Sequence, residues 1–249
     1  MLPTGLPPTA ARRLATVRKA FDCLERVQWL AAARPGMSES LRPTRCCRPD
    51  GADLPNILLD RKDIVELASA WLSGPSSLGE SVSVGKDAAG APRLEFRRTG
   101  NESLPIHLSG EGAHWLLPIL FCACWAELGE VDGPTMLAIE ELEARLHPNL
   151  QIALLERLLK TVSVGVPCVL ETHSIYLLRR AQLAVVKGEL APEDLAIYWV
   201  EREGHAAAVR QISVEADGTL LGWNPETFEE EQQLSREIFE NRWKAQASR

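Results

Sequence analysis

Two adjacent carboxylates, Glu140 and Glu141, follow the short apolar run from Met136 to Ile139. Such a run can form a buried parallel strand, and α/β folds assemble their sites at the carboxyl ends of these strands. There one carboxylate can hold Mg²⁺, directly or through water, and its neighbour can orient or deprotonate the water that attacks a γ-phosphate. We therefore predict Glu140 as the magnesium ligand and Glu141 as the general base. The alternative is a strand that ends in a solvated acidic loop.

Small residues precede the next apolar run upstream, which extends from Trp115 to Trp125. Ser109, Gly110 and Gly112 would let backbone amides touch a phosphate at the positive end of the following helix. Such a turn could hold an anion against the start of the helix. A Ser/Gly turn that only caps a buried helix is the alternative.

A histidine ends the apolar segment that begins at Val166. His173 could hydrogen-bond the γ-phosphate or the attacking water, which would give it a catalytic role, and Thr172 or Ser174 could cap a helix starting near Ile175. A simple cap or surface histidine is the alternative.

The amino-acid sequence around these residues resembles that of one ATPase group. The run 140–151, EELEARLHPNLQ, is similar to the "E-E-P-E-x-H-L-H-P-x-x-Q" run of AAA-type core ATPases related to the SMC and OLD families. Residues 108–112 resemble the ABC signature motif, which acts on ATP held by the opposite subunit, and residues 171–174 resemble the switch-histidine strand. The resemblance makes Glu140 and Glu141 the Walker B pair and places His147 in a loop at the dimer interface, among the nucleotide-binding residues.

The resemblance covers about residues 20–235, from a segment similar to "D-G-x-N-L" at Asp50 to Leu58 through an uncharacterised carboxyl-terminal domain. It implies an α/β fold: the C-terminal lobe of an ABC/SMC-like P-loop NTPase, with a helical lid and small antiparallel strands. ATP and Mg²⁺ are the implied cofactors. Leu142 departs from the pattern, because relatives usually have proline there.

No Gly-x-x-x-x-Gly-Lys-Ser/Thr phosphate loop occurs in the 249 residues. Gly85-Lys86 is the nearest match, but Glu80 stands where the first glycine should be. The fold is therefore expected to be incomplete without a Walker A lobe, which a homo- or hetero-oligomeric partner would supply. A misplaced start or a truncated gene is the alternative.

Two other functions remain open. A regulatory subunit could keep the fold and dimer surface without turning over ATP, although the intact Glu140, Glu141 and His173 speak against it. A metal nuclease of the Toprim kind would need an Asp-x-Asp pair after the histidine strand. Glu201 could be its early glutamate, but no such pair follows it.

Composition fits a soluble cytoplasmic chain. The net charge of −7 argues against a wholly basic nucleic-acid binder, but residues 1–50 are basic on balance and could face DNA or form a solvated arm. The six cysteines lack zinc-ligand spacing, and free thiols indicate a reducing compartment. The longest apolar run, near Trp115 to Ala126, is too short to span a bilayer and contains Pro118, so no membrane partner is expected.

Three regions are predicted: a basic N-terminal and lid region (1–103), an ATPase lobe (104–190), and a small α+β extension with an acidic tail (191–249). The expected elements are helices at 61–72 and 148–162, a core helix over the apolar run near Trp115 to Ala126, a loop at 35–56, and strands at 82–84, 93–98, 104–108, 195–200 and 207–214. The spacing over 10–33 is helical, and the strand that relatives have there is the alternative for its second half. A hairpin turn is expected at Asp217-Gly218.

Overall fold

The computed structural model describes residues 26–32, 47–74, 81–97, 103–129 and 133–223, with helical positions at 233, 236–241 and 243. The chain divides into two compact units after Ser174. Unit 1 contains every residue predicted to act on nucleotide, and unit 2 begins at Ile175.

Unit 1 is built on a parallel sheet of three strands in the order β1-β5-β6. The strands are β1 (Val27–Leu30), β5 (Met136–Ile139) and β6 (Cys168–Leu170). The predicted strand before Glu140 is therefore confirmed. In the second half of 10–33 the strand alternative is confirmed and the helical prediction is wrong; residues 10–25 and 33 lie outside the described part. Parallel neighbours need a crossover, and α5 (Pro148–Ser163) connects β5 to β6.

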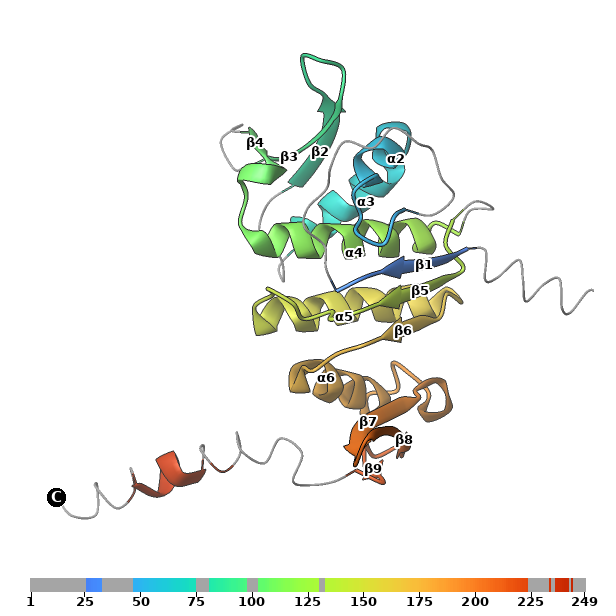
Figure 1. Ribbon diagram of the computed structural model, residues 1–249, viewed down its shortest axis with the longest axis vertical. Helices are drawn as coiled ribbons and strands as arrows, with labels where there is room; N and C mark the ends of the chain where they lie inside the picture. Colours follow the sequence, from blue (N-terminus) through green and yellow to red (C-terminus); the bar gives the residue numbers. More distant parts are fainter. Residues whose placement is uncertain are drawn as a thin grey trace, which may run out of the picture. The chain divides into compact units, whose positions relative to one another are not determined.

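The two faces of this sheet differ in burial. Leu30, Leu137 and Ile139 share one face and are 0 to 2% exposed. On the other face Trp29 is 47% and Val169 is 58% exposed. Helix α4 (Glu111–Glu127) contacts β1 and β5, α5 contacts β6, and the two helices contact each other, so both cover the buried face. Figure 1 shows α5 passing behind β5.

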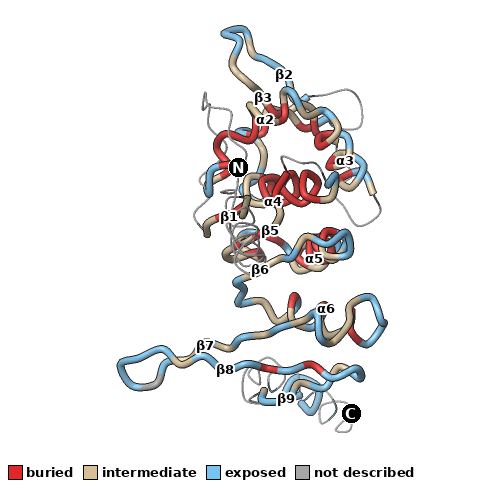
Figure 2. Tube along the Cα trace, turned by 90° about the vertical axis from the view of Figure 1, so that its right-hand side faces the viewer, coloured by how far each residue is buried: buried red, intermediate tan, exposed pale blue. Residues whose placement is uncertain are grey.

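Helix α4 forms the centre of the unit 1 core. Every residue from Leu116 to Ala126 is buried, and Figure 2 shows α4 as the most continuous buried segment. The predicted core helix is confirmed, and it begins at Glu111, before the apolar run. Arg157 of α5, 4% exposed, forms an ion pair with Glu127 and donates to Cys124 Sγ at 3.4 Å. A buried cation therefore has partners on the neighbouring helix.

Two helices and a small antiparallel sheet form the lid region. Helices α2 (Leu54–Asp60) and α3 (Lys62–Leu72) pack against β2 (Ser81–Lys86) and β3 (Pro92–Arg97), which continue to β4 (Ser103–Pro105). The predicted lid helix and the three strands are confirmed. The third strand is shorter than predicted, because Ile106–Leu108 forms a 3-10 turn.

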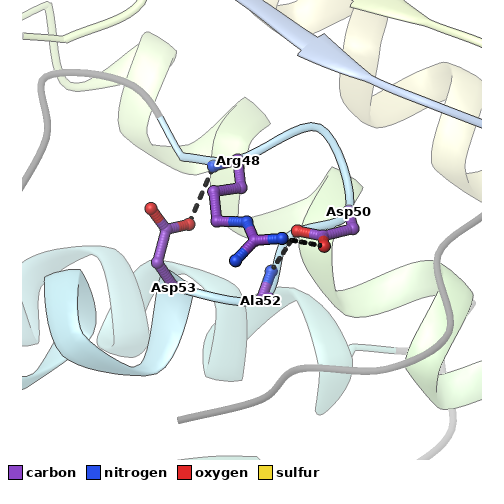
Figure 3. Close-up of polar contacts among 4 residues, drawn as sticks. All are labelled: Arg48, Asp50, Ala52 and Asp53. Carbon is purple, nitrogen blue, oxygen red and sulfur yellow. Dashed lines mark hydrogen bonds and ion pairs between the residues drawn. The ribbon is translucent and has the colours of Figure 1, made fainter. Parts of the chain in front are cut away.

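The loop predicted over 35–56 is wrong at its end, because α2 already begins at Leu54; residues 35–46 lie outside the described part. Figure 3 shows the turn that leads into this helix. Asp53 accepts from Arg48 N at 2.8 Å, and Asp50 accepts from Ala52 N at 3.1 Å and Arg48 Nη2 at 2.9 Å. Gly51, at φ +73, would place a Cβ 2.9 Å from Pro118 Cβ, so only glycine fits there.

Up to residue 223, unit 2 contains α6 (Ile175–Val186), a 3-10 turn (Pro192–Asp194) and three antiparallel strands: β7 (Ile197–Glu203), β8 (Ala206–Val214) and β9 (Leu220–Leu221). The predicted strands and the Asp217-Gly218 turn are confirmed. Gly218 has φ +85, and Asp217 accepts from Thr219 N at 2.9 Å. The predicted domain bounds remain a prediction.

None of the described helices combines the length and apolar character that a bilayer crossing requires. Nor do three His, Cys, Asp or Glu side chains come together as a metal site within the described ranges. Magnesium sites in nucleotide-handling proteins do not need such a cluster, because phosphate and water supply most ligands.

Two thiols are expected to make the protein less stable at alkaline pH. Burial raises the pKa of Cys124 and of Cys168, each to about 12. The native state then holds these protons more tightly than the unfolded chain, whose thiols titrate at about 8.5. The free energy of unfolding is therefore expected to be unaffected below that value and to fall as pH rises toward 12. Urea unfolding of the wild type and of Cys124→Ala/Cys168→Ala at several pH values tests this, and equal slopes in both proteins would contradict it.

Candidate functional site

The Glu140 carboxylate is fixed where two strands end. Its backbone N donates to Leu30 O at 3.0 Å, Oε1 accepts from Trp29 Nε1 at 3.0 Å, and Oε2 accepts from Ala32 N at 2.9 Å. These two bonds hold both carboxylate oxygens in a pre-set orientation. A carboxylate is a ligand type that a hard cation takes, directly or through water.

Glu141 follows in a left-handed backbone conformation, with φ 45. The residues on both sides explain how the turn is maintained. Glu140 is bonded to the end of β1, and Leu142 is fully buried with its N–H donating to Glu171 O at 3.4 Å. A non-glycine residue at positive φ costs about 1–3 kcal/mol and persists where its surroundings over-determine it, often at functional sites. Leu142, which replaces the usual proline, thus serves as an apolar anchor.

The short loop before α6 is bonded to the segment after β5. Glu143 accepts from Thr172 Oγ1 at 2.5 Å and from His173 N at 2.7 Å. Gln151, on α5, donates to Leu146 O at 2.8 Å and accepts from Ser174 Oγ at 2.6 Å. The structure therefore brings His173 next to the acidic segment, with its side chain exposed.

Glu143 and Gln151 are residues that sequence reasoning missed, as is Trp29. Glu143 and Gln151 match fixed letters of the pattern that the run 140–151 resembles, but the sequence indicated no partner for either. Trp29 carries no local signal, and the partners of Gln151 and Trp29 lie 23 and 111 residues away in the chain.

The predicted phosphate-binding turn begins α4. Ser109 Oγ donates to Ile106 O at 2.5 Å, and Gly110 is the N-cap residue, whose O accepts from Ala113 N at 3.0 Å. A Cβ on Gly112 would lie 3.1 Å from Arg145 O. Gly112 therefore permits close packing of α4 on the loop after β5, whatever its part in phosphate binding.

Two more contacts involve the loop after β5. Arg145 has φ 60, and its Nη1 lies 3.6 Å from Glu111 Oε2 on the exposed surface. His147 is the N-cap residue of α5, and its Nδ1 accepts from Asn149 N at 3.4 Å. The segment 141–147, which we call the acidic loop, thus contacts the start of α4, the start of α5 and the His173 loop.

Gly110 and Gly112 are expected to differ in how much an added methyl group destabilises the protein. Gly112→Ala is expected to destabilise the protein by about 1 kcal/mol relative to Gly110→Ala, because the new methyl group presses on a backbone oxygen that has little freedom to move. At Gly110 a Cβ meets nothing within 4 Å. Denaturant unfolding of the two matched variants compares them. Equal stabilities would show that the acidic loop yields freely at Arg145.

Comparison with known families agrees with this geometry. Residues 57–178 match the AAA ATPase domain. The AAA ATPase match runs from α2 through β5 and β6 into the start of α6, so it contains the acidic loop and His173. It supports an ATPase-type function on an α/β fold. No curated protein matches the chain significantly.

Solved structures of SMC ATPases resemble the chain distantly. One, from a study of ATP-driven dimerisation and DNA-stimulated activation, is 14% identical, with 64% of this chain and 89% of that chain covered and a TM-score of 0.43. The Pyrococcus furiosus Smc head with the C-terminal domain of ScpA is 13% identical, with 76% and 41% covered and a TM-score of 0.48. An SmcHead with the ScpA winged helix is 15% identical, with 66% and 46% covered and a TM-score of 0.46. The chain thus spans less than half of two of them, and these likenesses are too distant to bear on function.

Proposed function

We propose that this chain forms one part of an ATP-hydrolysing site. Glu140 holds Mg²⁺, directly or through water, and Glu141 takes the proton of the attacking water. His173 hydrogen-bonds the γ-phosphate or that water. Bound Mg²⁺ would supply charge neutralisation on the phosphate oxygens. The observation that carries the proposal is the acidic loop within the AAA ATPase match, which ties the Glu141 segment to the His173 loop.

A second lobe is needed to hold the phosphates. The 249 residues contain no phosphate loop, and Arg145, a cation within the acidic loop itself, faces Glu111. We propose that a partner chain, in a homo- or hetero-oligomer, contributes a Walker A loop. Ser109, Gly110 and Gly112 would in turn act on nucleotide held by the partner, and His147 would lie at that interface.

The open side of the parallel sheet supports this proposal. Parallel sheets are normally covered on both faces, whereas among the described residues Trp29 and Val169, which share one face, remain 47% and 58% exposed. Leu137 N donates to Pro167 O and Glu171 N to Ile139 O, so the backbone groups of Cys168 and Leu170 point away from β5. At that edge the described residues supply no further strand. A partner strand beside β6 would end next to the acidic loop.

Phosphate release from Mg-ATP tests the proposal. The chain, the product of the neighbouring upstream reading frame, and their mixture are assayed separately. Turnover well above the sum of the two components is expected in the mixture. A mixture that forms a stable complex but releases no phosphate would instead support the rival function, a regulatory subunit without turnover. The absence of a phosphate loop favours that rival.

We propose that ATP hydrolysis serves a DNA-linked process. The basic balance of residues 1–50 in the sequence supports a DNA-linked role. Duplex DNA is then expected to raise phosphate release by the mixture, with an effect that weakens as salt rises. A DNA-independent rate at low salt would contradict this role.

A further inference from the structure

We propose that Glu143 is a positioning residue that latches the His173 loop to the acidic loop. The inference rests on the proposed function only where it gives His173 a role in ATP hydrolysis. The latch itself is a property of the chain alone.

The first argument is the bonding of the carboxylate. Its two oxygens accept from different kinds of donor, the Thr172 hydroxyl at 2.5 Å and the His173 backbone N–H at 2.7 Å. These donors lie 29 and 30 residues from Glu143 in sequence. Hydrogen bonds to an ionised carboxylate are about twice as strong as neutral ones. One side chain therefore joins two loops that the sheet alone brings only into the same neighbourhood.

The second argument is how fully the His173 loop is tied down. Glu171 N donates to Ile139 O at 2.9 Å, and Ser174 N donates to Thr172 Oγ1 at 3.0 Å. Ser174 Oγ also reaches Gln151 at 2.6 Å. Because the outer residues of the loop bond to β5 and α5, Glu143 is left to hold its middle, where His173 lies.

The third argument is the place of Glu143 beside Glu141. The acidic loop turns sharply at Glu141, and Ala144 N donates to Glu141 O at 3.0 Å to close that turn. The same turn therefore presents Glu141 and holds the backbone of His173. Positioning of this kind lowers a barrier by fixing reacting groups before the reaction begins.

Glutamate is the side chain this role requires. A glutamine has the same size but only one acceptor oxygen, and its NH₂ group cannot accept the His173 N–H. Glu143→Gln should therefore loosen the latch without creating a cavity. Glu171→Gln is the matched control, because it removes one charge from the same loop and Glu171 contacts the acidic loop through its backbone.

Two readouts are measured on the chain without nucleotide. In Glu143→Gln the exchange of the His173 amide hydrogen is expected to rise at least tenfold, and the His173 ring signals in NMR spectra are expected to broaden or split. In Glu171→Gln both are expected to stay as in the wild type. Thr172→Val is a second, isosteric variant, which should expose the Ser174 amide to exchange. Unchanged exchange in Glu143→Gln and in Thr172→Val would overturn the latch.

A third readout tests whether the latch positions His173 for catalysis or only stabilises the loop. In the reconstituted mixture Glu143→Gln is expected to lower kcat about tenfold with KM within twofold. A loosened loop with unchanged kcat would overturn the positioning role. If the mixture does not hydrolyse ATP at all, the proposed function fails, while the exchange and NMR results still decide the latch.

Discussion

Exchange of Glu141 for glutamine is expected to lower ATP turnover by the reconstituted mixture at least about 100-fold, the usual contribution of a general base. Glutamine keeps the length and polarity of the side chain but cannot take the proton of the attacking water. ATP is then held without being cleaved, so ATP-dependent association should be preserved or tightened. Phosphate release measures the first effect, and sedimentation velocity with and without Mg-ATP measures the second.

The control for this experiment is Glu66→Gln on α3, an exposed carboxylate in the lid region. It removes the same charge away from the acidic loop and is expected to leave turnover within twofold of the wild type. Unchanged turnover in Glu141→Gln would remove Glu141 from the role of base. Loss of turnover together with loss of association would point to misfolding of the acidic loop.

Arg157→Ala is expected to cost about 3 kcal/mol of stability, a typical result when one partner of a buried ion pair is removed. The substitution leaves Glu127 without this cation and opens space between α4 and α5, where Arg157 is only 4% exposed. Both helices support the sheet from which the acidic loop emerges. The free energy of unfolding in urea is the measurement.

Lys160→Ala supplies the comparison on the same helix. Lys160 is exposed near the end of α5, and surface substitutions usually change stability by less than about 0.5 kcal/mol. Equal losses in Arg157→Ala and Lys160→Ala would show that the buried pair contributes nothing beyond helix propensity.

Sequence patterns predicted the elements whose signals are local. The apolar run before Glu140, the lid helix and the Asp217-Gly218 turn depend on neighbouring residues, and the structure confirms them. Helix α2 was missed because Pro55 reads as a loop residue, whereas it lies in the first turn of that helix, where proline is tolerated.

The buried face of α5 shows a different limit. By hydrophobic spacing, four residues of this helix should point inward: Ile152, Leu155, Leu158 and Leu159. Leu155 and Leu158 are buried, but Ile152 and Leu159 are only half-buried, and Gln151 and Arg157 are buried instead. These polar side chains tolerate burial because each has partners on another element. Spacing cannot reveal partners that folding brings from elsewhere.

The candidate site divides in the same way. Glu140, Glu141 and His173 could be picked out from the sequence as candidate site residues, and the roles assigned to them remain predictions. The hydrogen bonds that fix their positions could not be predicted from the sequence. The Trp29 bond to Glu140 and the Glu143 bonds to the His173 loop join residues far apart in the chain. Gly112, predicted for phosphate contact, also proves to be a packing position against Arg145.

The most direct test of the central claim is calorimetric binding of Mg-ATP to the chain, alone and with the product of the neighbouring upstream reading frame. Binding only in the mixture is the predicted result, because the acidic loop needs a phosphate-holding partner. Binding by the chain alone would contradict the shared site and require a phosphate cradle within this chain. No binding in either case would contradict the ATPase proposal itself.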